Sequence, residues 1–400
     1  MKKFIAFFML LSALAISAQA QNESTPQIRQ KTFEKVWKIV NETFYDPNFG
    51  GVDWKKVRAD YAPKVSAVKS DAELYVLLNK MLGELKVSHL VVLTPNELKR
   101  LSGVAASTGL GLREIENQIV ITRILENSSA AKAGLKTGYV VVKIDGEALK
   151  NFNDLQRKLT GEPNTTLRLL FLDEKDELKE VTLERAILSN AEKGSLGGGL
   201  NISALFEAKR LENNIGYIRF SNFVKVLDAQ IAAAIESMKD APGIIIDLRG
   251  NSGGDDEVAL KMANMFFDKE TLLMVTKTRQ GEDFDYKAKP GKGAYSGKLV
   301  ILVDEFSGSA SEQFSAGMQE SGRAFVIGKT TKGEDLDADI AELPTGALLI
   351  YALGQPHTPK GVIIEGRGVI PNKIVNLTRK DLLAGRDAQF QAAIDYIKGN

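Results

Sequence analysis

Two stretches in the second half of the chain limit what it can fold into, because each is an uninterrupted apolar run followed by a glycine-rich turn. The runs are GIIID, residues 243–247, and LVILV, residues 299–303. Strands that are apolar on both faces are typical of parallel sheets covered by helices. Helical patterns follow them, at 258–267 and from Ser309. We therefore expect an α/β core with a mostly parallel sheet over residues 188–400.

The part of the chain before this core has a different, helical pattern. Apolar residues recur at helical spacing from Phe33 to Phe44 and again from Leu74 to Leu85. Asp71 precedes the second of these runs and is the expected N-cap of its helix. We expect a helical subdomain over residues 21–103.

The first residues have the anatomy of a secretory signal. Lys2 and Lys3 precede an apolar run from Phe4 to Ile16, and the small-residue pattern Ala18-Gln19-Ala20 follows. We expect residues 1–20 to be a signal peptide that is removed. The mature chain would then be periplasmic or secreted, with no transmembrane span after signal cleavage.

Composition excludes several classes of site. The chain has no cysteine, which excludes disulfides and thiolate metal sites, and only two histidines, so we expect no metal site and no cofactor. Its 52 basic and 51 acidic residues nearly cancel. A nucleic-acid partner is therefore not expected.

The stretch FSGSASEQF, residues 306–314, has two interpretations. Ser309 and Glu312 fit a helix capping box. Ser309 also stands between a buried strand and a helix, where backbone N–H groups favour developing negative charge and a nucleophile could act. Gly253 and Gly254 follow the neighbouring strand, as an oxyanion hole or as an ordinary tight turn.

Residues 104–187 resemble a PDZ domain, which makes this part a β-rich insert. TGLGL matches the carboxylate-binding loop, AAKAGLKTG the short helix and VVVKIDG the central strand. The resemblance implies binding of extended peptides by strand addition, with the terminal carboxylate on backbone N–H groups. The loop residues are Gly109, Leu110, Gly111 and Leu112.

The motifs of the core, together with the layout of the chain, resemble the carboxyl-terminal processing peptidases, also called tail-specific proteases. The matching stretches are GIIIDLRGNSGG, LVILVDEFSGSASEQF and PKGVIIEGRGVIPN. The resemblance implies an exported serine endopeptidase that acts on protein or peptide substrates, engaged through their C-terminal ends. It also implies that Ser309 is the nucleophile, with an oxyanion hole from the N–H of Ala310 and of Gly253 or Gly254.

The identity of the general base does not follow directly from this resemblance, because bacterial relatives use a lysine in a stretch like G-x-x-T-x-G-K-G. Here the stretch is GKTTKGED, and Glu334 stands where that lysine should be. Lys332 lies two residues early and is either a shifted base or a surface lysine. A third hypothesis is that the fold is kept as a peptide-binding scaffold without catalysis.

A second branch of this superfamily resembles tricorn protease and uses a Ser-His pair late in the helical part. Ser88-His89 in GELKVSHL matches that pair, and Glu365 matches the glutamate that orients the histidine through the serine. The resemblance implies His89 as base, with Ser88 and Glu365 as orienting residues. His89 could instead cap the preceding helix, and Glu365 could pair with Arg367 or Lys360. His357 is expected at the surface.

Overall fold

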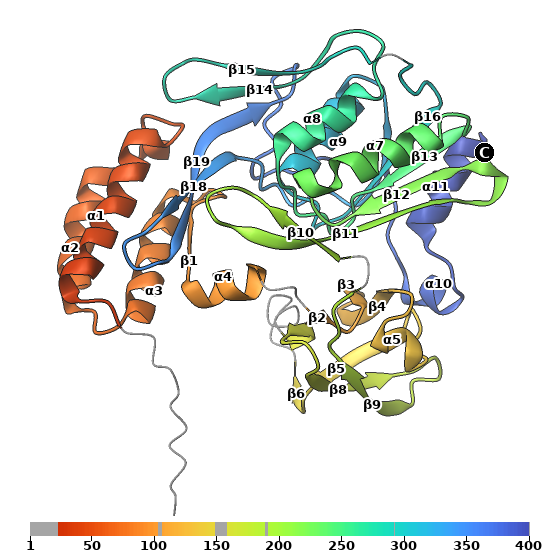
Figure 1. Cartoon of the computed structure of the whole chain (residues 1–400), viewed down its shortest axis with the longest axis horizontal. Coiled ribbons are helices and arrows are strands. Elements are labelled where there is room, and N and C mark those ends of the chain that lie inside the picture. Colours follow the sequence, from red (N-terminus) through yellow and green to blue (C-terminus); the bar gives the residue numbers. More distant parts are fainter. Residues whose placement is uncertain (1–22, 103–105, 149–157, 189–190, 292, 400) are drawn as a thin grey trace, which may run out of the picture.

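The computed structural model describes residues 23–399 apart from 103–105, 149–157, 189–190 and 292. The expected signal peptide lies outside these residues, and so do most of residues 153–159, whose sequence pattern suits a helix. The described chain forms a helical part, an α/β core and a small β-rich domain beside the core (Figure 1). The predicted fold class is confirmed. Within the described residues, no helix has the length and apolar content needed to span a bilayer.

Three helices pack together in the N-terminal part, namely α1 (Pro26–Thr43), α2 (Trp54–Ala67) and α3 (Asp71–Leu82), and a further helix, α4 (Pro95–Ser102), comes later in it. The apolar stripes of the first three helices meet in one core around Phe33, Leu74 and Leu78, none of which is exposed. The N-cap of α3 is Ser70, whose hydroxyl accepts from the Glu73 N–H at 3.1 Å. The prediction of Asp71 as N-cap is wrong by one residue, because two capping-type residues are adjacent and the serine makes the contact.

The core contains a seven-stranded sheet in the order β10-β11-β12-β13-β16-β17-β20. Pairing is antiparallel for β10–β11 and β11–β12 and parallel from β12 onward. The strands are β10 (Ala191–Ser195), β11 (Asn201–Arg210), β12 (Gly216–Phe220), β13 (Gly243–Asp247), β16 (Lys298–Val303), β17 (Phe325–Gly328) and β20 (Lys373–Ile374).

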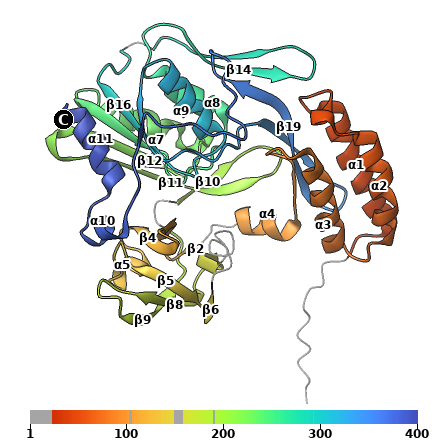
Figure 2. The same ribbon diagram turned by 180° about the vertical axis from the view of Figure 1, so that it is seen from behind.

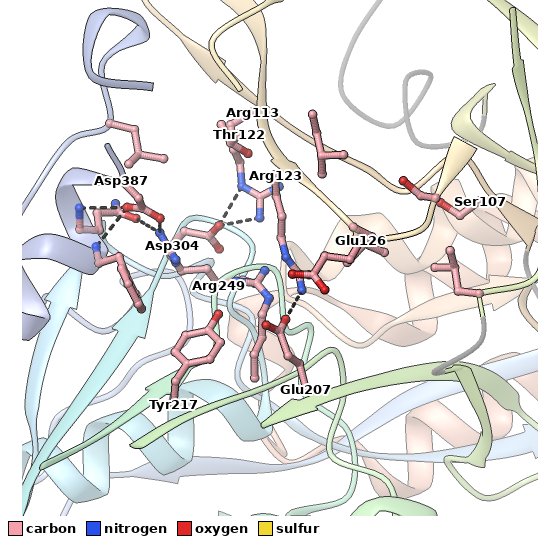
Figure 3. A pocket seen from close by; sticks show the side chains of 18 of the residues that line it. Ser107, Arg113, Thr122, Arg123, Glu126, Glu207, Tyr217, Arg249, Asp304 and Asp387 are labelled. Carbon is pink, nitrogen blue, oxygen red and sulfur yellow. Dashed lines mark hydrogen bonds and ion pairs between the residues drawn. The ribbon is translucent and has the colours of Figure 1, made fainter. Parts of the chain in front are cut away.

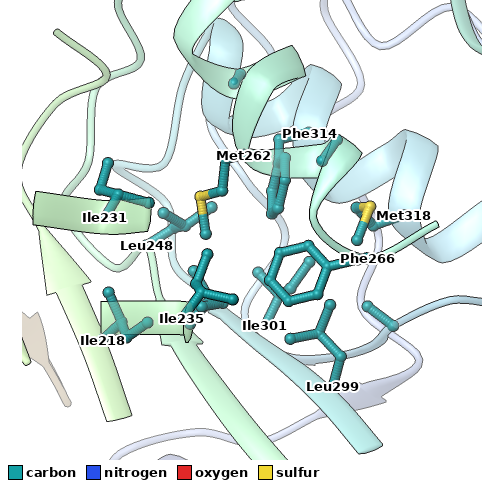
Figure 4. Packing of buried hydrophobic residues seen from close by; sticks show 14 of the residues in the cluster. Ile218, Ile231, Ile235, Leu248, Met262, Phe266, Leu299, Ile301, Phe314 and Met318 are labelled. Carbon is teal, nitrogen blue, oxygen red and sulfur yellow. The ribbon is translucent and has the colours of Figure 1, made fainter. Parts of the chain in front are cut away.

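Helices cover both faces of this sheet, which is why its strands are apolar on both sides. Alternate residues such as Ile246 and Ile301 pack under α7 (Asp228–Ser237), α8 (Asp256–Asn264) and α9 (Ala310–Glu320) (Figure 4). The intervening residues, such as Ile245 and Val300, pack under α11 (Ala388–Lys398) on the other face (Figure 2).

A second, antiparallel sheet joins the helical part to the core. Its strands are β1 (Val91–Leu93), β14 (Thr271–Thr278), β15 (Phe284–Ala288), β18 (Asp337–Glu342) and β19 (Leu348–His357). Strand β1 pairs with β19, with Val92 opposite Leu349. Because Ser88 and His89 come just before β1, this pairing carries both residues to the core.

The PDZ-like domain has the antiparallel order β3-β4-β5-β8-β9, with β6 (Glu147–Ala148) on β5. The bounds are β3 (Leu110–Ile115), β4 (Gln118–Ile124), α5 (Ser129–Lys132), β5 (Val140–Ile144), β8 (Thr166–Leu172) and β9 (Leu178–Glu184). Strand β3 is an edge strand that directly follows Gly109. Gly109 has φ +81°, and a Cβ there would lie 2.2 Å from Ser128 Cβ, so this turn requires glycine.

The last part of the core chain contacts the PDZ-like domain before it ends in α11. Helix α10 (Arg379–Leu383) places Leu382 against Ile115 and Val140, and the Thr137 hydroxyl donates to the Leu382 carbonyl at 3.0 Å. The Arg379 guanidinium donates to the Gly138 carbonyl at 3.0 Å. This helix therefore ties the inserted domain to the end of the core.

Candidate active site

Ser309 occupies a strained position between β16 and α9. It is the N-cap of α9, with φ 51° and ψ −127°, a region that residues with a side chain rarely adopt. The Glu312 carboxylate accepts from the Ser309 N–H at 3.1 Å, so the predicted capping box forms. The cap and the candidate nucleophile are thus one residue. Such strain is typical of functional sites, where the surrounding structure holds it in place.

Glu312 fixes the loop that faces Ser309. Its buried carboxylate accepts from the Gly333 N–H at 2.7 Å, the Glu334 N–H at 3.0 Å and the Thr331 hydroxyl at 2.5 Å. The Ser309 N–H also donates to the Glu334 carbonyl at 2.8 Å. Burial raises the pKa of the Glu312 carboxyl, and these hydrogen bonds oppose that rise.

Gly253 lies against Ser309, and its amide differs from that of Gly254 in whether it has a hydrogen-bond partner. A Cβ on Gly253 would come within 2.6 Å of Ser309 Cβ, so the approach requires glycine. The Gly253 N–H donates to Asn251 Oδ1 at 2.9 Å. Among the hydrogen bonds of the described residues, neither the Gly254 N–H nor the Ala310 N–H is a donor. Of the two glycines considered for an oxyanion hole, Gly254 therefore has the available amide.

Ser88 links His89 to Glu365. The Ser88 hydroxyl lies 2.7 Å from His89 Nδ1 and 2.9 Å from Glu365 Oε2, and the Ser88 N–H donates to Glu365 Oε1 at 2.7 Å. His89 is half-buried. Burial lowers the pKa of its imidazole, and the charge of Glu365 partly opposes this shift. The arrangement favours a neutral ring near pH 7.

One short segment contacts both halves of the site. The Asp335 N–H donates to Glu365 Oε2 at 2.8 Å, and the preceding carbonyl, that of Glu334, accepts from Ser309. The described residues show no hydrogen bond between the Ser309 hydroxyl and the His89 ring. Nucleophile–base contacts of this kind are often long without substrate and shorten when substrate binds.

The other residues considered for the site make contacts that differ from those their alternative roles would need. Lys332 Nζ lies 2.6 Å from Glu334 Oε2, and its side chain is 42% exposed. Within the described chain, the ion pairs include none from Glu365 to Arg367 or Lys360. His357 is partly exposed in β19, where its ring contacts the Gln355 side chain at 3.1 Å. Among the described residues, no group of three or more histidines and carboxylates could hold a metal ion.

Sequence reasoning missed three polar residues near Ser309. Asn251 is fully buried and occupies the Gly253 amide, and the NSGG motif could have drawn attention to it. Asp304 directly follows β16 and contacts both loops of the site. Asp335 is fully buried, and both of its carboxylate oxygens lack a hydrogen-bond partner among the described residues. Nothing in the local sequence marks Asp304 or Asp335.

Comparison with known proteins finds family models that match three parts of the chain. The model of peptidase family S41 matches residues 214–375, that of the tricorn protease C1 domain residues 26–83, and that of the PDZ domain residues 120–173. The chain belongs to peptidase family S41. It is a serine peptidase of the carboxyl-terminal processing type with a PDZ domain.

Individual relatives of this S41 peptidase are distant in sequence but match it over most of its length. The carboxyl-terminal-processing protease of Synechocystis sp. is 27% identical over 409 residues, which cover 99% of this chain and 93% of the relative. The photosystem II D1 C-terminal processing protease has a TM-score of 0.61 at 23% identity, covering 90% and 98% of the two chains. Tricorn protease has a TM-score of 0.53 at 18% identity, covering 94% and 37%. These two structures share the fold with the S41 peptidase.

Proposed function

We propose that this S41 peptidase cleaves peptide bonds through an acyl-enzyme on Ser309, with His89 as the general base. The observation that carries the proposal is the position of Ser88, whose hydroxyl contacts both His89 Nδ1 and Glu365. A serine nucleophile needs a base that is held in one orientation by a third group. Ser88 and Glu365 supply that third group.

The hydrogen bonds of Ser88 also favour one tautomer of His89. Glu365 accepts a hydrogen bond from the Ser88 hydroxyl. The Ser88 oxygen is therefore left to accept a hydrogen bond from an N–H at His89 Nδ1. The lone pair of Nε2 is then available to take a proton from Ser309. Glu365 further stabilises the imidazolium that results.

The reaction would proceed in two steps, acylation of Ser309 and hydrolysis of the acyl-enzyme. Ser309 Oγ attacks the substrate carbonyl carbon while Nε2 of His89 takes the hydroxyl proton, and the N–H groups of Gly254 and Ala310 donate to the oxyanion. When the C–N bond breaks, His89 returns its proton to the leaving amine. Water then attacks the ester carbonyl while His89 takes a proton from it. The ester C–O bond breaks, His89 returns this proton to Ser309 Oγ, and the carboxylic acid product leaves. General base catalysis of this kind contributes roughly 10²–10⁴-fold to the rate.

The PDZ domain would bring substrates to this site. Its edge strand β3 and the Gly109 turn are suited to an added peptide strand whose terminal carboxylate meets backbone N–H groups. The signal-like residues 1–20 support action outside the cytoplasm, in the periplasm or after secretion.

Labelling with a fluorophosphonate probe tests the proposal, because the probe reacts with an activated serine. We expect the wild-type protein to be labelled, Ser309→Ala not to be labelled, and His89→Ala to be labelled far more slowly. A wild type that stays unlabelled, where a related active S41 peptidase is labelled, would instead support a peptide-binding scaffold. Full labelling of His89→Ala with loss in Lys332→Ala would support a Ser-Lys dyad.

A further inference from the structure

Among the described residues, two ion pairs between the PDZ domain and the core line a cavity of 830 Å³ (Figure 3). Arg113 contacts Asp304 at 2.7 and 2.8 Å, and Arg123 contacts Glu207 at 2.7 Å. The first pair is nearly buried, with side chains 14% and 6% exposed, whereas the second is 31% and 32% exposed. Both pairs join an arginine of the PDZ domain to a carboxylate of the core, but the two carboxylates differ in what else they contact.

The two oxygens of Asp304 serve different parts of the molecule. Oδ1 accepts from the Gly250 N–H at 2.9 Å and from the Phe306 N–H at 3.1 Å. Gly250 begins the turn that leads to Gly254, and Phe306 lies in the loop that leads to Ser309. Oδ2 accepts from Arg113. One carboxylate therefore joins the oxyanion turn to the nucleophile loop, and its other oxygen is held by the PDZ domain.

Arg113 also contacts these two segments directly. Its guanidinium carbon lies 4.6 Å from the centre of the Phe306 ring, and a Cβ on Gly250 would be 2.8 Å from Arg113 Nη2. A further guanidinium nitrogen donates to the carbonyl of its neighbour Leu112 at 2.8 Å, which fixes the side chain to strand β3. Arg113 thus closes over the point where the two loops meet.

We propose that Asp304 is a positioning residue for catalysis, which aligns the oxyanion turn with Ser309, and that Arg113 completes this alignment from the PDZ domain. The inference rests on the function proposed above. Transition-state stabilisation by N–H groups depends on their placement to within a few tenths of an ångström, about 0.5 Å in working sites. Without Arg113, the Asp304 carboxylate loses its counter-ion, and its hold on both loops loosens.

The Arg123–Glu207 pair provides a matched control. It also joins the PDZ domain to the core, and removing it also breaks one ion pair between arginine and a carboxylate. Glu207 lies on β11, where its backbone pairs with that of Arg219 on β12. Among the described residues its carboxylate contacts Arg123 and Lys209, and no contact joins it to the loops around Ser309. A general loosening of the PDZ domain would affect both pairs alike.

The test compares Arg113→Ala, Arg113→Lys, Asp304→Asn and Arg123→Ala in the full chain. Each is assayed for kcat and KM on a peptide substrate and for the rate of fluorophosphonate labelling. We expect Arg113→Ala and Asp304→Asn to lower kcat and the labelling rate about 10-fold or more, with KM little changed, because the lost alignment acts in the transition state. Arg113→Lys should recover part of the loss, and Arg123→Ala should stay within about twofold of wild type.

A double variant separates positioning from independent damage. Asp304→Asn turns an amide donor toward Arg113 and breaks the contact, so adding Arg113→Ala should cost little further activity. Equal losses in Arg113→Ala and Arg123→Ala would overturn the proposal, as would fully multiplicative losses in the double variant or an effect confined to KM. An unlabelled wild type would mean that the proposed function itself fails. Thermal melting of each variant shows whether a loss reflects unfolding instead.

Discussion

Ser88 gives Glu365 two hydrogen bonds, one from its N–H and one from its hydroxyl, although the residues are 277 positions apart. The same hydroxyl contacts His89 Nδ1. The helical part and the late part of the core therefore meet at one serine. Strand β1 begins two residues after His89 and pairs with β19, so backbone pairing directly after the Ser88–His89 pair holds it in place.

His89 and Lys332 should respond differently to replacement. His89→Ala should lower kcat/KM by about 10³-fold, because it removes the general base. Lys332→Met should change kcat/KM by less than about threefold, because the ammonium pairs with Glu334 at a partly exposed position. Peptide cleavage assays check both, with circular dichroism to confirm folding. The reverse order of effects would favour Lys332 as base.

The pH dependence of kcat/KM should report on His89. The base acts when neutral, so the rate falls as pH drops through its pKa in the free enzyme. Burial lowers that pKa below the ordinary value of 6.5, so activity should persist to lower pH than an exposed histidine would allow.

Replacing Glu365 should move the same acid limb in a defined direction. The charge of Glu365 raises the His89 pKa. Glu365→Gln should therefore shift the acid limb to still lower pH, and it should lower the plateau about 10- to 100-fold because the ring is less well oriented. A shift to higher pH would show that Glu365 does not act on the titrating group.

Gly254 should tolerate no side chain. Its φ is +140°, and a Cβ would lie 2.1 Å from the Phe223 carbonyl oxygen, so Gly254→Ala must displace the turn that carries the oxyanion amide. We expect kcat to fall about 100-fold or more, as for loss of an oxyanion donor. Gly281→Ala is the control, since Gly281 has φ +76° with open space around it. It should cost about 1 kcal/mol of stability and no activity.

Asp335→Asn should stabilise the protein. Burial, then the neighbouring Glu312, raise the pKa of Asp335 well above 3.8. The stability that this carboxyl contributes is therefore present below pH 3.8 and is lost as pH rises through its folded-state pKa. Asparagine carries no charge, and its amide can donate to nearby carboxylates. The free energy of unfolding of the Asp335→Asn variant should exceed that of wild type by about 1 kcal/mol or more at neutral pH.

Urea denaturation at mildly acidic and mildly alkaline pH checks this expectation. The difference between Asp335→Asn and wild type should grow as pH rises. A difference that is constant with pH would mean that Asp335 does not titrate in the way its burial implies.

The sequence predicted features that depend on local pattern. The runs 243–247 and 299–303 became β13 and a buried part of β16, and the helix after Ser309 begins at Ala310. Strand β18 and the sheet it joins were not predicted, because its side chains are partly exposed without clear alternation. Helix α10 spans only five residues, too few to give a periodic signal.

The site residues also divide into those that sequence motifs mark and those whose roles depend on contacts in the folded structure. Motifs pointed to Ser309, His89, Ser88 and Glu365, and the structure brings Ser88, His89 and Glu365 into direct contact. The choice between Gly253 and Gly254 depends on where the Asn251 side chain points, which no motif shows. The role of Asp304 depends on Arg113, which lies 191 positions away.

The contact between Ser88 and Glu365 also implies an order in time. A chain is synthesised from its N-terminus, so His89 emerges first, then Ser309, and Glu365 last. Until Glu365 has emerged and folded against Ser88, nothing fixes the imidazole. A partly synthesised chain would therefore be inert toward itself and its neighbours, and proteolytic competence would arise only after most of the core has been made.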